Sequence, residues 1–234
     1  MSMSRCVSFR VLGSVRGRVA RVVGVGVSCV ALAVGALVAS PAAVAADPIT
    51  HQDYVDYYHL DSARAKGYTG KGVIIALIDG PVELSDPELA GATIVDKSRC
   101  TVNDSPDGVR HATDMATLLV SPYTGVAPDA TLYTYQITSE DTQPGGTCVR
   151  GADTTDSIDK LINQAVDDGA QIISISLSNS EHGSEIKWAI ANAISKGVII
   201  VSSSGNGATD ENRSHLGRWS GVVGVTAINT DGTF

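Results

Sequence analysis

A carboxylate closes a run of six apolar residues and is the first side chain in this 234-residue sequence placed to do chemistry. Residues 73–78 are mostly β-branched, which is typical of a strand buried on both faces. Asp79 follows, and Gly80 and Pro81 break the strand. Open α/β sheets bind ligands and hold catalytic groups at the carboxyl ends of their strands, so Asp79 suits either role. The alternative is an aspartate that only caps the next turn.

A histidine opens the next ordered stretch and could transfer protons near neutral pH. Met115, Leu118 and Leu119 follow His111 at spacings that predict a helix over residues 111–120 with one buried face. Asp114 would then lie in the first turn of this helix, where the dipole favours negative charge. A single histidine at a helix start is also explained as a cap or a surface residue.

Short apolar runs typical of strands alternate along the chain with stretches whose apolar residues have helical spacing, and these patterns predict the elements that position the two side chains. Strands are expected at residues 73–78, 92–95, 131–137, 171–177, 198–201 and 222–225. Helices are expected after residue 53, at 111–120, from Ser157 as N-cap to a stop at Gly169, and from about 186 to Gly197. Polar loops should cover residues 97–110 and 138–156. This alternation predicts an α/β fold with a doubly wound, mostly parallel sheet and helices on both faces.

The net negative charge and the absence of nucleotide-binding patterns argue against nucleic acids and nucleotides as partners. The formal net charge is −8, and all five arginines of residues 1–46 stand in a segment without any acid. The rest of the chain is therefore still more acidic, which disfavours nucleic-acid binding. The sequence also lacks the glycine-rich patterns of nucleotide sites, so no nucleotide is expected.

The N-terminal residues predict export. An arginine-rich start, an apolar run at residues 22–38 and Val-Ala-Ala at 44–46 are typical of a signal peptide cleaved before Asp47. The domains expected are thus a signal peptide at 1–46 and the N-terminal part of one α/β domain at 47–234. An uncleaved membrane anchor is the alternative. We expect a secreted or extracytoplasmic protein.

Cysteine usage agrees with an oxidising compartment. Cys6 and Cys29 would leave with the signal peptide, which leaves Cys100 and Cys148 as an even pair. A disulfide between them is expected, and two free thiols are the alternative. The spacing does not resemble a zinc site, and no metal ligands are assigned.

Four stretches in order resemble the subtilisin family of serine proteases. Ala-Leu-Ile-Asp-Gly-Pro-Val at 76–82 is similar to the aspartate motif of that family. His-Ala-Thr-Asp-Met-Ala at 111–116, with Gly-Val-Ala-Pro-Asp-Ala at 125–130, resembles its histidine helix. Ile-Ser-Ile-Ser-Leu-Ser at 173–178 resembles the strand along its substrate cleft, and residues 199–206 the strand and loop of its oxyanion asparagine. The match runs from about residue 50 to the end, and the start at Asp47 is most similar to mycosin-type secreted proteases of actinobacteria.

The resemblance implies a role for each residue. Asp79 would orient His111, which would act as general base and then as general acid. The side-chain amide of Asn206 would donate to the oxyanion. The backbone of Ser176, Leu177 and Ser178 would pair with an extended polypeptide substrate. No cofactor is implied. Calcium is common in the family, but no acidic ligand pattern is readable here.

The nucleophile of the family has no counterpart in the sequence. Its serine opens a helix in a Gly-Thr-Ser-like segment, and no such segment follows Asn206; Ser214 and Ser220 stand in other contexts. We therefore expect a secreted serine endopeptidase whose C-terminal portion, with the last strand and helices and any membrane anchor, lies beyond Phe234. The alternatives are a catalytically inactive, truncated pseudoprotease or binding module of the same fold, and an unrelated α/β binding protein. The sequence does not indicate the oligomeric state.

Smaller departures also bear on the site. Ala112 and Asp114 replace the usual glycine and second histidine beside His111. The Asp114 carboxylate could approach the ring and raise the pKa of His111. Ser178 replaces a common glycine of the cleft, which would narrow the substrate channel.

Overall fold

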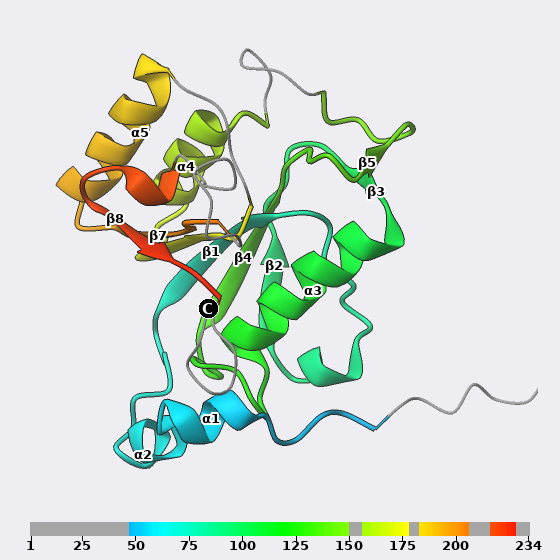
Figure 1. Cartoon of the computed structure of the whole chain (residues 1–234), viewed down its shortest axis with the longest axis vertical. Helices are drawn as coiled ribbons and strands as arrows, with labels where there is room; N and C mark the ends of the chain where they lie inside the picture. Colours follow the sequence, from blue (N-terminus) through cyan, green and yellow to red (C-terminus); the bar gives the residue numbers. More distant parts are fainter. Residues whose placement is uncertain (1–46, 150–155, 178–182, 206–215, 228–234) are drawn as a thin grey trace, which may run out of the picture. The chain divides into compact units, whose positions relative to one another are not determined.

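A six-stranded sheet, parallel in every pair, runs through the protein in the order β2-β4-β1-β6-β7-β8 (Figure 1). The computed structural model describes residues 47–149, 156–177, 183–205 and 216–227, all in one unit of the chain. The strands of this sheet are β1 Ile74–Asp79, β2 Thr93–Asp96, β4 Thr131–Gln136, β6 Ile172–Ile175, β7 Ile199–Ser203 and β8 Val222–Val225. The helices are α1 Asp53–Tyr57, α2 Leu60–Ala65, α3 Pro106–Val120, α4 Ile158–Asp167 and α5 Ser184–Ser195, with short 3-10 turns η1 Pro87–Leu89 and η3 Leu216–Arg218.

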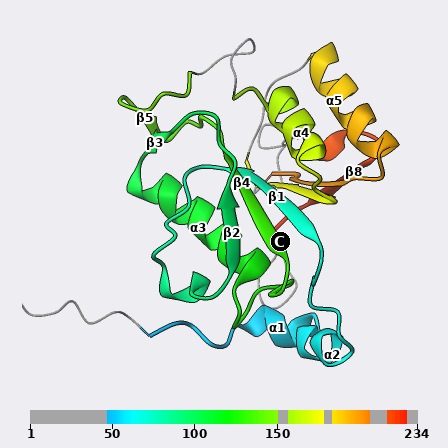
Figure 2. The same ribbon diagram turned by 180° about the vertical axis from the view of Figure 1, so that it is seen from behind.

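Strand β1 lies at the centre and packs on both faces. Ile75 and Leu77 belong to a core with the buried side of α3, while Ala76 and Ile78 belong to a second core with α4 and α5. Helices therefore cover both faces of the sheet (Figures 1 and 2). This confirms the predicted doubly wound α/β fold, because an apolar run without alternation needs a cover on each side.

The predicted strands all form, with ends displaced by one or two residues. The strand expected to run to Leu177 ends at Ile175, and β8 matches its expected bounds. Helices α4 and α5 also form, with Ser157 at the N-cap position of α4. Gly169 and Gly197 follow their helices with φ of 89° and 78°, a left-handed conformation that favours glycine.

Helix α3 begins five residues earlier than the periodicity predicts. Ser105 is its N-cap and accepts a hydrogen bond from the Gly108 N–H at 3.1 Å, and Pro106 takes the first helical position. The first turn therefore contains Asp107 and not Asp114. The prediction placed the start at His111 because the first turn is polar and partly exposed. His111 consequently lies inside the helix.

The N-terminal helix is two short helices without an apolar stripe. His59 adopts φ of 53° and separates α1 from α2, and only Val55 of the expected apolar face is buried, while Tyr58 is 58% exposed. Hydrogen bonds hold this segment instead: the Tyr54 hydroxyl donates to the Thr124 carbonyl at 3.0 Å, and Arg64 donates to the Gly125 carbonyl at 2.6 Å. No helix of the described ranges is both long and apolar enough to cross a membrane.

The two polar stretches predicted as loops pair with each other. Strands β3 Asn103–Asp104 and β5 Thr142–Gln143 form a two-stranded antiparallel ribbon, in which Asp104 lies opposite Thr142. A disulfide joins Cys100 and Cys148 beside this ribbon, as predicted from the even cysteine count. Apart from β3, β5 and the start of α3, the described residues of both stretches form loops, as their polar composition predicts. The short strands escape prediction because they pair segments that are about 40 residues apart in the sequence.

Candidate active site

Asp79 and His111 meet where strand β1 ends. The Nδ1 atom of His111 lies 3.0 Å from Oδ1 of Asp79, although the two residues come from different elements. The Asp79 side chain is 1% exposed and the His111 side chain 41% exposed, so the carboxylate is buried and the ring reaches the surface. The Gly80 N–H donates to the same Oδ1 at 2.8 Å. This arrangement fixes the carboxylate from the strand side and directs it at the ring.

Local contacts hold helix α3 against the end of β1. The Thr113 hydroxyl accepts a hydrogen bond from the Glu83 N–H at 2.9 Å, which ties the loop after β1 to the helix. Ala112 is fully buried next to the site. Because Ala112 and Thr113 are buried and Asp114 is exposed, the partly exposed His111 lies at the edge of the buried face of α3, where its ring meets Asp79.

The pKa of His111 is raised above its ordinary value. The main cause is the hydrogen bond with Asp79, and the negative charges of Asp79, Asp114 and Asp141 act in the same direction, while partial burial opposes them. With Nδ1–H donating to the carboxylate, Nε2 carries the lone pair that can accept a proton. The pair is therefore a base whose protonated form is stabilised by a buried carboxylate.

A cleft opens beside this pair. Its lining contains two of the residues that the sequence assigned to substrate, Ser176 and Leu177, which directly follow β6. The whole lining is Asp79, Gly80, Asp104, Gly108, His111, Ser139, Asp141, Ser176 and Leu177. Ser178 and Asn206, the other predicted substrate and oxyanion residues, lie outside the described residues.

Sequence reasoning missed the acidic side chains of the cleft, Asp104 and Asp141. The pKa of Asp104 is raised, chiefly by burial and also by the charges of Asp141 and Asp79; the Ser105 N–H and His111 oppose this rise. Both aspartates stand in stretches that read as surface loops. The one signal that could have brought the two loops together is the expected disulfide, because Cys100 lies in the first loop and Cys148 in the second.

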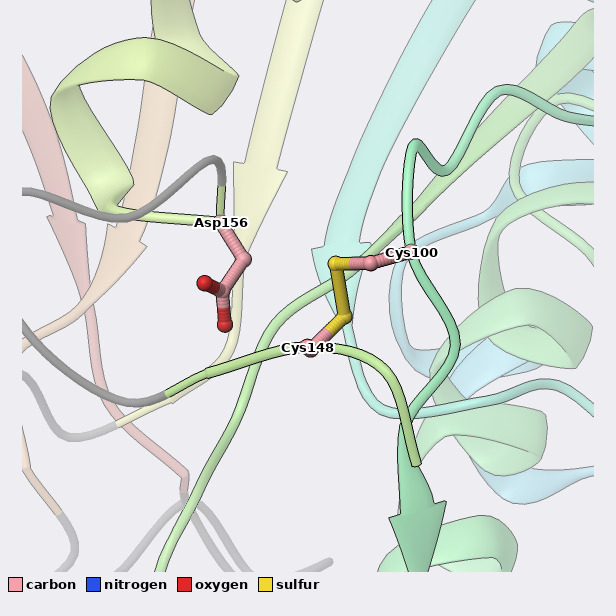
Figure 3. Close-up of side chains that lie close together, drawn as sticks. All are labelled: Cys100, Cys148 and Asp156. Atoms are coloured by element: carbon pink, nitrogen blue, oxygen red, sulfur yellow. A yellow bond between two sulfur atoms is a disulfide. The ribbon is translucent and has the colours of Figure 1, made fainter. Parts of the chain in front are cut away.

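The disulfide lies next to a buried carboxylate, Asp156 (Figure 3). Asp156 is 2% exposed and accepts a hydrogen bond from the Thr138 hydroxyl at 3.2 Å. In the part of the chain that the structure describes, Cys100, Cys148 and Asp156 are the only group with three metal-type donors, and these lie within 4.8 Å of one another. Since the two sulfurs are bonded to each other, they offer no thiolate ligands in this state.

Comparison with known proteins places this geometry in context. A sequence model of the subtilase family (Peptidase_S8) matches residues 70–233. The chain is 34% identical over 172 residues to the minor extracellular protease Vpr of Bacillus subtilis (strain 168), which covers 66% of this chain and 20% of Vpr. It is 25% identical over 178 residues to subtilisin E of the same strain, which covers 71% of this chain and 44% of subtilisin E.

A solved structure has the same fold. The prenylagaramide maturation protease PagA superposes with a TM-score of 0.57 at 22% identity, over 74% of this chain and 60% of PagA. The chain thus spans a fifth of Vpr and less than half of subtilisin E.

Proposed function

This chain belongs to the subtilase family, and from that premise we propose that the protein is a secreted serine endopeptidase that uses Asp79 and His111 as two members of an Asp-His-Ser triad. The observation that carries the proposal is the 3.0 Å contact between His111 Nδ1 and the buried Asp79 carboxylate. A general base held in one tautomer by a buried carboxylate is what a hydroxyl nucleophile requires.

In this mechanism His111 removes the proton of the nucleophilic serine through Nε2 and later delivers it to the leaving amine. Asp79 keeps the proton of Nδ1 in place and stabilises the imidazolium that forms when the serine attacks. We assign the nucleophile to none of the described residues, because the family's serine segment has no counterpart in the sequence.

The substrate would be a polypeptide in extended conformation. Ser176 and Leu177 line the cleft beside His111, which supports a path for the substrate backbone along this segment. Asn206 is proposed as the oxyanion donor, because it follows β7, the neighbour of β6 in the sheet. One oxyanion donor of this kind is typically worth about 3–4 kcal/mol in the transition state; subtilisin, a relative, supplies that reference value.

Export is part of the proposal. Residues 1–46 have the pattern of a signal peptide, and the relative Vpr is named as an extracellular protease. The mycosin-type resemblance also stays a prediction, since the family match does not separate the branches of the subtilases.

The test starts by sequencing the coding DNA past Phe234. The complete open reading frame is then expressed. Purified protein is assayed on a quenched fluorescent peptide and on casein, with and without phenylmethylsulfonyl fluoride. We expect both substrates to be hydrolysed, and we expect the inhibitor to block this hydrolysis. His111→Ala should abolish it, whereas His51→Ala, which changes an exposed histidine, should leave it intact.

Two other outcomes would decide against the proposal. Hydrolysis that survives both the inhibitor and His111→Ala would assign the activity to other residues. A folded protein without hydrolysis would favour the alternative, a catalytically inactive binding module of the same fold.

A further inference from the structure

One wall of the cleft is acidic, and its residues are held in place by several contacts. Asp104 lies at the end of β3 and Asp141 directly before β5. The Ser105 N–H lies within hydrogen-bond distance of both segments, 3.1 Å from Asp104 Oδ1 and 3.1 Å from the Asp141 carbonyl. A Cβ on Gly108 would lie 2.5 Å from Cγ of Asp104, so the carboxylate packs directly on the backbone of α3. The Asp104 side chain is therefore held against α3, and the backbone of Asp141 is tied to the same turn.

The described residues around the cleft do not balance the negative charge of this wall. Among the residues that the structure describes, no lysine or arginine lines the cleft, and neither Asp104 nor Asp141 forms an ion pair. Asp79, which also lines the cleft, adds to the charge: its side chain is 1% exposed, and its Oδ2 atom has no hydrogen-bond donor among the described residues. Among the described lining residues, His111 is the only one whose side chain can carry positive charge, and it faces Asp79. A ligand with positive charge would supply what the cleft lacks.

The geometry favours an organic cation over a metal ion. In the described ranges, the carboxylates of the cleft do not bring three donor atoms within 4.8 Å of one another, as a compact ion would need. An ammonium or guanidinium group on a long aliphatic stem can instead reach carboxylates that are further apart. Such groups are the side chains of lysine and arginine.

We propose that the cleft selects polypeptides with a lysine or arginine close to the bond to be cleaved, and that Asp104 and Asp141 determine this preference. The inference rests on the proposed function in one respect, namely that the cleft receives a peptide. Asp104 is half-buried and would hold the cation more tightly, and the exposed Asp141 would attract it from solvent.

The test compares matched peptides on the full-length protein. Blocked octapeptides carry one lysine, or one glutamine as the neutral control, at each position in turn. Hydrolysis is read as kcat/KM by mass spectrometry, and binding as Kd by fluorescence anisotropy of the same labelled peptides. The variants are Asp104→Asn and Asp141→Asn. Glu140→Gln is the matched control, because Glu140 is an exposed neighbour of Asp141 that does not line the cleft.

We expect lysine to be preferred over glutamine about threefold to tenfold at one or two positions. Asp104→Asn or Asp141→Asn should reduce this ratio toward one, Glu140→Gln should not, and 0.5 M salt should weaken it. Equal use of lysine and glutamine peptides, or a preference that both aspartate variants retain, would overturn the inference. Circular dichroism confirms that each variant is folded.

The two proposals fail separately in this design. Hydrolysis without a preference for lysine would support the proposed endopeptidase activity and contradict the proposed role of Asp104 and Asp141 in specificity. Binding that prefers lysine without any hydrolysis supports the acidic wall and contradicts the endopeptidase.

Discussion

Oδ1 of Asp79 accepts two hydrogen bonds, one from His111 Nδ1 at 3.0 Å and one from the Gly80 N–H at 2.8 Å. A single buried oxygen thus joins the end of the central strand to helix α3. Because the backbone N–H is fixed by the strand end, the carboxylate has little freedom to rotate away from the ring. The pair is preorganised before any substrate enters.

Replacing Asp79 by asparagine should abolish most of the activity. An amide of the same shape can donate to Nδ1 and so stabilise the tautomer in which Nε2 carries the proton and cannot act as a base. We expect kcat of the full-length enzyme to fall by about 10⁴-fold with little change in KM, measured on a fluorogenic peptide. Asp129→Asn, at an exposed carboxylate outside the cleft, serves as the control. A loss of less than tenfold would show that Asp79 does not orient the base.

The activity should decrease on the acid side at a pH above the ordinary histidine value of 6.5. His111 acts as a base only when neutral, and the hydrogen bond with Asp79 raises its pKa, so kcat/KM falls as the pH drops through that raised value. Stability changes in the other direction: the favourable pairing of protonated His111 with Asp79 is present below the unfolded pKa and is lost as pH rises through the folded pKa. The pH profile of kcat/KM checks this, and an acid limb below pH 6.5 would contradict it.

Asp114→Asn should lower the pKa of His111. The Asp114 carboxylate lies three residues further along α3, on the exposed side, and its charge favours the imidazolium. A two-dimensional NMR titration of the histidine ring signals in both proteins measures the difference. Asp107→Asn is a control on the same helix, since Asp107 pairs with Arg110 and has no part in the shift of His111. An unchanged pKa of His111 would refute the role of Asp114.

Removing the disulfide should destabilise the protein and loosen the acidic wall. The bridge closes a loop with a sequence separation of 48, for which the chain-entropy model gives about 4 kcal/mol. We expect the double variant Cys100→Ser and Cys148→Ser to unfold at lower urea concentration than the oxidised protein, with circular dichroism as the readout. Addition of a reducing agent should affect the parent protein and leave the double variant unchanged. Equal stability of the oxidised and reduced parent would contradict this expectation.

The sequence by itself determined the type and order of the main elements. Residues 73–78 are apolar without alternation, so the strand they form must be covered on both faces, and the stripes of α4 and α5 supply one cover. Asp79 could be located at the site because a strand end is defined by its own neighbours, Gly80 and Pro81. The even cysteine pair was also readable, because cysteine count and export constrain each other.

Tertiary structure alone decided what lies around that carboxylate. The contact between Asp79 and His111 was expected only through the family resemblance, since periodicity does not specify which strand end meets which helix. Asp104 and Asp141 reach the cleft because two polar segments pair as β3 and β5, and the local sequence of each segment indicates only a loop. The early start of α3 is an exception: Ser105 and Pro106 form a local start signal, which apolar periodicity misses because the first turn has no apolar stripe. Local patterns fix elements because they arise from neighbouring residues, whereas the site arises from contacts between segments that are far apart in the chain.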